Sequence, residues 1–215
     1  MRTMIMTMAL MLSVNVMAQD VAESFEKAKV QVKEKASKEA RSEAKRLKKE
    51  GWSVSPGALP MERQLQEAYE YQLARDNKRN KLYYMGEGKS VGESYDAARL
   101  QAVEVARQEL AGQVGSEATR LVEVLTANKQ LPQKQAASIS TTISEAKSLY
   151  SQKIGKVEII MEASRELKNG NTEVLIRMAA SANSINELSK SAVREELEKN
   201  GIKMSEELKA KMANY

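Results

Sequence analysis

The sequence of 215 residues contains no cysteine and no histidine. These absences remove the thiol nucleophile, the imidazole general base and the nitrogen and sulfur ligands that zinc prefers. They also exclude disulfides and an acylated N-terminal cysteine, so we expect a protein that is not a lipoprotein. The only aspartates are Asp20, Asp76 and Asp96, and none lies in a calcium-loop pattern. We therefore expect no metal, no cofactor and no enzymatic activity.

One enzymatic alternative survives these absences. Two glutamates can act as the acid and base of a glycosidase if a groove holds them at the right separation. Glutamates are spread over the whole chain, and the sequence singles out no pair. A Glu-dependent hydrolase is therefore kept as an alternative without named residues.

Aromatic residues and long apolar runs are scarce as well. One Trp, one Phe and seven Tyr leave the core to aliphatic residues and alanine, and a carbohydrate groove would need aromatic platforms. Beyond the first residues, no segment is apolar for the roughly 20 residues that a membrane-spanning helix needs. We expect no integral membrane segment after processing.

The first residues have the pattern of a secretory signal peptide. Arg2 precedes an apolar run from Met4 to Leu12, and small residues stand at Val16 and Ala18. We expect a signal peptide over residues 1–18, cleaved near Ala18/Gln19, and a periplasmic or secreted protein; a buried N-terminal helix is the alternative. Loss of Arg2 lowers the formal net charge from +5 to +4, which favours solubility and indicates no nucleic-acid partner.

Residues 19–50 are expected to form a charged amphipathic helix. Its apolar stripe is mostly alanine, so it should pack weakly, on the domain or on a partner helix. The stripe comprises Val21, Phe25, Ala28, Val32, Ala36, Ala40 and Leu47. The basic cluster Lys45, Arg46, Lys48 and Lys49 is interleaved in sequence with Glu34, Glu39, Glu43 and Glu50, which favours a solvated face over a nucleic-acid or phospholipid patch.

A linker over residues 51–60 separates this helix from an expected α+β domain at residues 61–215. Gly51 should cap the helix, and Pro56, Gly57 and Pro60 prevent regular helix in the linker. Trp52 is the only tryptophan, and it is expected either to plug the edge of a core or to contact a partner. Together with Tyr69, Tyr83 and Tyr84 it forms the set of candidate partner-contact residues.

The stretch YYMGEGKSVGES predicts a junction between a strand and a helix. Leu82–Glu87 should form the strand, and Ser90 with Glu93 should form a capping box for the helix that follows. Lys89 and Ser90 lack the spacing of a phosphate-binding loop, so the glycines are expected to serve as a hinge. In the helix, one apolar face should pack on the core, namely Leu100, Val103, Ala106, Leu110, Val114, Leu121 and Leu125.

Later residues predict a helix from Pro132 to Tyr150, a hairpin, and a helix capped by Ser184. Asn169-Gly170 between alternating segments favours a two-residue turn. This turn would place Met161 opposite Met178, with Ile176 beneath the long helix. The resulting order is a small antiparallel sheet with helices on one face, of the α+β class, with a βαββα-like core.

A family resemblance rests on the segment YYMGEGKSVGESYDAARLQAVEVARQELAGQV. The matching residues are Gly86, Gly88, Ala98, Arg99, Ala102, Ala106, Arg107, Leu110 and Ala111. Over about residues 82–199 the chain resembles the LPP20-like family of bacterial envelope proteins and is similar to the N-terminal domain of flagellar assembly protein T. The resemblance implies a non-enzymatic module that docks on other envelope components, and it supplies no catalytic residue.

Two functions are therefore expected from the sequence. The first is an exported interaction or assembly module of the cell envelope with a protein partner. The alternative is a structural protein that self-associates through its N-terminal helix.

Overall fold

The structure is a computed structural model that describes residues 30–31, 33–128 and 131–213. The expected signal peptide, and the start of the expected N-terminal helix at residues 19–29, lie outside the described residues. The first described element is the N-terminal helix, helical at residues 30–31 and 33–49. The remaining elements are α2 (Met61–Leu73), β1 (Tyr83–Gly92), α3 (Tyr95–Ala127), α4 (Gln133–Glu145), α5 (Lys147–Lys153), β2 (Glu158–Glu166), β3 (Thr172–Ser181), α6 (Ala182–Lys199) and α7 (Glu206–Ala213).

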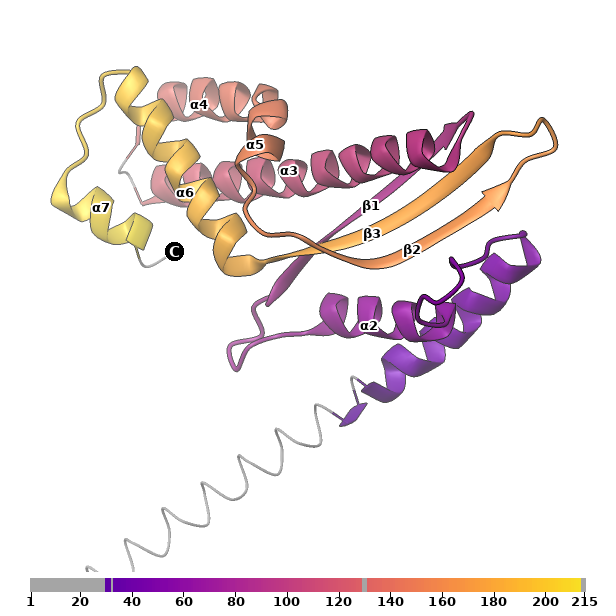
Figure 1. Ribbon diagram of the computed structural model, residues 1–215. Helices are drawn as coiled ribbons and strands as arrows, with labels where there is room; N and C mark the ends of the chain where they lie inside the picture. The colour runs from indigo at the N-terminus through magenta and orange to yellow at the C-terminus, as the bar shows by residue number, and fades with distance from the viewer. Residues whose placement is uncertain (1–29, 32, 129–130, 214–215) are drawn as a thin grey trace, which may run out of the picture.

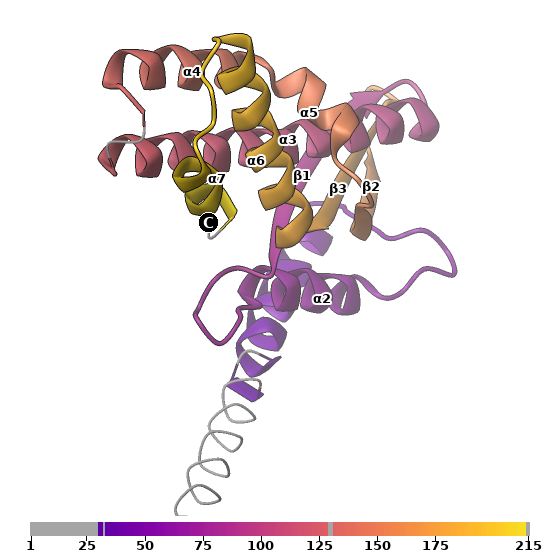
Figure 2. The ribbon, with the colours of Figure 1, turned by 90° about the vertical axis from the view of Figure 1, so that its left-hand side faces the viewer.

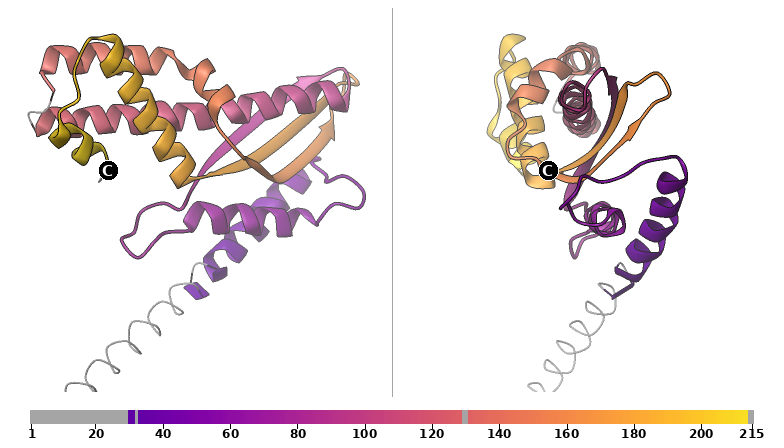
Figure 3. Two further views of the ribbon diagram at one scale, coloured as in Figure 1. Left: turned by 60° about the vertical axis from the view of Figure 1, so that its left-hand side comes forward. Right: turned by 45° about the vertical axis from the view of Figure 1, so that its right-hand side comes forward.

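The three strands form one antiparallel sheet in the order β1-β3-β2. Helices pack against this sheet, which confirms the α+β class (Figure 1). The helices that follow β1 lie on one face of the sheet, as expected, and the elements that precede β1 form a second layer on the other face. Figure 3 shows α3 on one side of the sheet and the N-terminal helix with α2 on the other. Since β3 lies between these layers, seven of the ten residues of this central strand are buried.

The first face of the sheet carries the larger core. Ile176 and Met178 of β3 lie in one cluster with Leu110 and Val114 of α3, as expected for Ile176. Helix α3 is much longer than the sheet, and its C-terminal half packs against α4, α5 and α6 (Figure 2). The buried residues Leu208 and Met212 of α7 close this end of the cluster.

The second face is covered by the N-terminal helix and α2. Ala40, Ala44 and Leu47 pack in one cluster with Met161 and Leu175 of the sheet. The alanine stripe therefore packs on the domain. The helix ends as expected at Gly51, whose φ is 89°, and the amide of Trp52 donates to the Leu47 carbonyl at 3.0 Å.

The hairpin register differs by one residue from the expected one. Leu167 donates to the carbonyl of Asn171 at 2.8 Å, so the loop has three residues, with Gly170 at φ 80°. A turn followed by a left-handed glycine is the usual solution for a three-residue hairpin loop, and it competes with the two-residue turn for the same Asn-Gly pair. Further along β2, a β-bulge lies at Ile160, between Ile159 and Met161.

The register places Met161 opposite Arg177 instead of Met178. Met161 and Met178 consequently lie in different clusters, on opposite faces of the sheet. A one-residue slip always exchanges the two faces of a strand. Strand β3 offers apolar residues to both faces, Val174 and Ile176 to one and Leu175 to the other, so the pattern of apolar residues could not decide between the two registers.

Helix boundaries also depart from expectation in three places. Strand β1 continues to Gly92, and Ser94 rather than Ser90 caps α3 by accepting from the amide of Ala97. Leu100 is 68% exposed and belongs to the outer face of α3. The segment expected as one helix is divided into α4 and α5 at Ala146, and Ser181 rather than Ser184 caps α6.

The register predicts which cysteine pair will form a disulfide. Ser164 lies opposite Val174, and its amide and carbonyl face Ser53 rather than β3, so this is a closely spaced pair without hydrogen bonds between the two residues. Ser164→Cys with Val174→Cys should crosslink under mild oxidation, because such pairs fall within disulfide reach. Non-reducing electrophoresis measures the yield. The matched pair Ser164→Cys with Leu175→Cys should stay reduced, and the opposite ranking would restore the two-residue turn.

Candidate functional site

The glycines of β1 lie directly under the backbone of α3. A Cβ on Gly88 would stand 1.9 Å from the carbonyl oxygen of Ala102, and one on Gly86 would stand 2.3 Å from that of Ala106. A Cβ on Gly92 would likewise stand 2.6 Å from the amide nitrogen of Ala98. Strand and helix therefore touch backbone to backbone, with glycine on one side and alanine on the other.

This contact leaves no room for a phosphate on the glycine face. None of these three glycines has a positive φ, so their role is close approach and not the unusual backbone conformation of a hinge. Lys89 points to the other face of the sheet, where its Nζ lies 5.6 Å from the centre of the Trp52 ring. The Gly-x-Gly segment therefore serves the close packing of β1 against α3.

We predict opposite effects for two Gly→Ala substitutions. Gly88→Ala should lower the free energy of unfolding by about 1 to 3 kcal/mol or more, because backbone atoms of α3 must move. At Gly112, in the middle of α3, an added Cβ has no neighbouring atom within 4 Å, so Gly112→Ala should raise the free energy of unfolding by about 0.5 to 1 kcal/mol. Urea titration measures both; equal effects at the two positions would contradict the close approach.

The densest polar cluster of the second face surrounds Arg177 of β3. Its Nη1 and Nη2 donate to both carboxylate oxygens of Glu43 at 2.9 and 2.8 Å, and its Nε donates to Glu87 at 2.7 Å. The Tyr69 hydroxyl donates to Glu43 at 2.8 Å. Arg46 completes the cluster at 3.1 Å from Glu43. These contacts join the N-terminal helix, α2, β1 and β3 at one point.

The fold shifts the pKa values of three groups in this cluster, Glu43, Tyr69 and Arg177. Burial opposes the charge of Glu43, but the hydrogen bonds from Arg177 and Tyr69 outweigh it, and the pKa of Glu43 lies below its usual 4.5. Burial, and then the hydrogen bond to Glu43, raises the pKa of Tyr69 to about 12. Burial works against the Arg177 charge too, yet its two carboxylate partners raise the pKa of this guanidinium further.

The lowered pKa of Glu43 predicts an acid-labile contribution to stability. Because the folded pKa lies below the unfolded value of 4.5, this contribution is present above about pH 4.5 and is lost as the pH falls through the folded pKa. Glu43→Gln should lower the free energy of unfolding at pH 7 by about 1 to 3 kcal/mol, and by less at pH 3. Glu39→Gln, on an exposed neighbour of the same helix, is the control and should change it little.

Trp52 is a core residue of the second face. It is only 3% exposed, and the guanidinium of Arg165, on β2, lies 4.7 Å from the centre of the Trp52 ring. Arg165 also donates to the Glu50 carbonyl at 2.9 Å, which ties the end of the N-terminal helix to the sheet. The adjacent Ser53 pairs with Ser164 on the edge of β2.

The other three aromatic candidates are divided between the two faces of the sheet, and Tyr69 alone of them packs against the cluster of Trp52. Tyr69 reaches inward to Glu43, whereas Tyr84 belongs to the opposite core, where its hydroxyl donates to Glu117 at 2.6 Å. Tyr83 stacks on Tyr71 with ring centres 4.4 Å apart. The four candidates therefore do not form one continuous aromatic surface.

Pairs of glutamates line two shallow depressions of the described surface. Glu67 and Glu162 line a groove of about 460 Å³ beside β2, together with the exposed Leu59 and Ile159. The carboxylate of Glu162 is held by Arg99, at 2.9 Å, and by the hydroxyl of Tyr95. These partners join β2 to the first turns of α3.

The carboxylates of the second pair also bind other groups of the fold. Glu87 and Glu109 line a depression of about 300 Å³ beside Arg177. Glu87 binds Arg177, while Glu109 accepts a hydrogen bond from the Glu87 amide on the outer edge of β1. Among the described residues no group of three or more acidic, cysteine or histidine side chains could hold a metal ion.

No described helix is both long enough and apolar enough to cross a membrane. Comparisons with protein-family models, with curated proteins and with solved structures found no match. The Arg177 cluster itself is absent from the expectations drawn from the sequence. The available signal was a single arginine in the apolar segment EVLIRMAA, which indicates a charge that must find a partner when the strand is buried.

Proposed function

We propose that the protein is an exported, non-enzymatic interaction or assembly module of the cell envelope. The main observation in support is the use of its polar groups. The charged side chains that converge inside the described structure are bound to one another, across layers in Arg177–Glu43 and Arg99–Glu162 and between neighbouring strands in Arg165–Glu173. Such pairs define a scaffold, whereas catalysis needs converging groups that remain open to a substrate.

The proposed location rests on the sequence of the first residues. The signal-peptide pattern through Ala18 favours export, and the absence of cysteine argues against an acyl anchor. The resemblance of residues 82–199 to the LPP20-like family agrees with an envelope protein that binds other proteins. The strand, long helix, hairpin and helix order of β1, α3, β2, β3 and α6 is compatible with that resemblance.

Self-association through the N-terminal helix is the alternative. A coiled coil would need an apolar stripe free to meet a second copy. Ala40, Ala44 and Leu47 are instead buried against the sheet, and Glu43 between them binds Arg177. This arrangement favours a heterologous partner over self-association through this part of the helix.

A hydrolase built on two glutamates finds less support. Glu162 and Glu87 each bind an arginine, so neither carboxylate is free of a partner inside the fold. The groove beside β2 also lacks an aromatic side chain among its lining residues. Sugar platforms usually depend on such side chains.

Crosslinking in cells with a tagged chain tests the proposal. We predict that the protein recovered from the periplasmic or secreted fraction begins at Gln19 and is crosslinked to a different envelope protein. Intact-mass measurement identifies the N-terminus, and mass spectrometry of the crosslinked species identifies its composition. A C-terminal tag is suitable because it leaves the first residues unchanged.

Two outcomes would count against the proposal. A chain that retains Met1 and stays in the cytoplasm would refute export. Crosslinked homodimers without another protein would favour the self-association alternative.

A further inference from the structure

The packing of the N-terminal helix fixes which of its faces points away from the protein. Ala36, Ala40, Ala44 and Leu47 are at most 3% exposed and define the inward stripe. With about 100° between successive residues, the opposite arc of the helix is then determined. That outward arc, taken within about 75° of its midline and called here the basic face, carries six cations and one acid: Lys35, Lys38, Arg41, Lys45, Arg46, Lys49 and Glu34, all exposed.

The acids that alternate with these cations in sequence lie elsewhere in space. Glu43 turns toward the sheet and binds Arg177, and Glu50 binds Arg46 at 2.8 Å. Glu39 falls on the same flank as Glu43 and Glu50, at about 40° from the former and 20° from the latter around the helix axis. The alternation that suggested a neutral solvated face is therefore resolved into an acidic flank and a basic face.

Little within the described structure neutralises the basic face. Arg46 pairs with Glu43 and Glu50, but the other five cations have no carboxylate within ion-pair distance among the described residues. Residues 33–50 hold eight basic and four acidic side chains, a net charge of +4, against +5 for the whole chain. Nearly all of the excess charge is thus concentrated on one helix.

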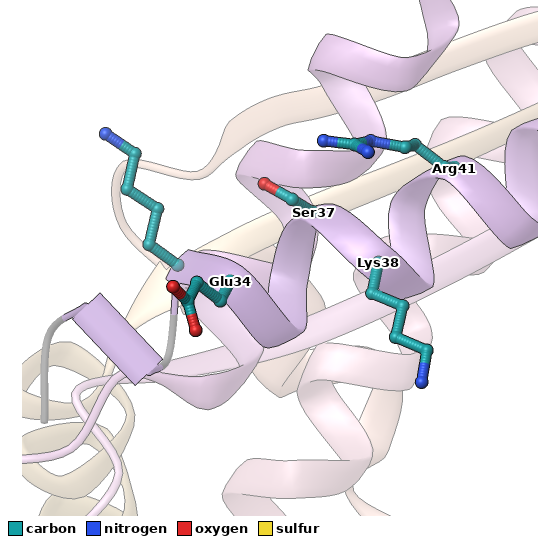
Figure 4. A pocket seen from close by; sticks show the side chains of 5 residues that line it. Glu34, Ser37, Lys38 and Arg41 are labelled. Atoms are coloured by element: carbon teal, nitrogen blue, oxygen red, sulfur yellow. The ribbon is translucent and has the colours of Figure 1, made fainter.

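The basic face is long, shallow and rich in lysine. From Lys35 to Lys49 it extends for about 20 Å at 1.5 Å per residue. An open depression of about 380 Å³ lies along it, lined by Lys33, Glu34, Ser37, Lys38 and Arg41. Figure 4 shows the side chains of Lys38 and Arg41 leaving the helix in different directions, so they do not converge on a single anion.

We propose that the basic face docks electrostatically on a bilayer surface that contains anionic phospholipid. An extended row of hydrated lysine charges matches a laterally spread negative surface, whereas recognition of one phosphate would favour converging arginines. The basic face has no aromatic residue on which nucleic-acid bases could stack. Because the apolar stripe is held on the sheet, docking leaves the helix on the surface without insertion.

Vesicle co-sedimentation of the full chain tests this proposal. Each basic residue near an anionic surface contributes roughly fivefold to partitioning. Wild-type protein should bind vesicles with 30% phosphatidylglycerol in phosphatidylcholine, and Lys38→Gln, Arg41→Gln and Lys45→Gln together should weaken binding by about 100-fold. Binding should also fall steeply with added salt.

The matched control removes the same charge elsewhere. Lys134→Gln, Lys168→Gln and Lys203→Gln change three exposed lysines with the same loss of net charge and the same N-terminus. This variant should bind vesicles like wild type.

Three results would overturn the proposal. These are no binding to the anionic vesicles, equal losses in the two triple variants, or tighter binding to a DNA duplex than to vesicles through the same residues. The first two would deny a role to this particular face, and the third would assign it to nucleic acid. None of them bears on export or on a protein partner, so the proposed function is tested separately.

Discussion

Arg177 is a nearly buried cation in the central strand, and the position of the whole second layer depends on how its charge is neutralised. Its guanidinium binds both oxygens of Glu43 and one of Glu87, so its planar donors are divided between a helix and a neighbouring strand. A lysine could not hold both partners in this geometry. Neutralising the charge of Arg177 therefore also positions the N-terminal helix, because the carboxylate of Glu43 belongs to the helix that covers Arg177.

The opposite face of the sheet solves a different problem. There the long helix α3 lies directly on strand β1, and glycine and alanine at the contact leave no side chain to hold the two apart. Glycines at alternate positions of β1 meet alanines spaced four apart on α3, which brings the two backbones into contact. The two helical layers are thus attached to the sheet in different ways. Helix α3 is attached through glycine and alanine contacts, and the N-terminal helix through long polar side chains that lie between its alanines.

Much of this architecture was predictable from local patterns. The α+β class, the helix that ends at Gly51, the long helix α3 and the hairpin all follow from periodicity, capping residues and turn residues. These features depend on neighbours in sequence. The register of the hairpin did not follow, because Asn169-Gly170 suits a loop of two residues as well as one of three, and both faces of β2 offer apolar residues.

The candidate site was much less predictable than the fold. The chosen aromatic residues were singled out by type, yet burial depends on contacts across the chain, and these place Trp52 and Tyr84 in separate cores. Likewise, the partners of Glu43 and Arg165 lie far away in sequence, so the alternation of charges along the N-terminal helix was misleading about its faces. A helical pattern gives angles around the axis, but only packing fixes which angle faces outward.

The wide separation of partners has a consequence for how the chain folds as it emerges from a ribosome or a translocation channel. Glu43 and Arg177 are 134 residues apart, and Tyr83 pairs with Ser181 at the far end of the sheet. Strand β1 and the N-terminal helix therefore have no sheet to join until the central strand has been delivered near the end of synthesis. Among the described strands, the only pairing between sequence neighbours is the β2–β3 hairpin, so assembly of the sheet should start late and proceed backward along the sequence. Until then the helices of the first half of the chain have no sheet against which to bury their apolar faces.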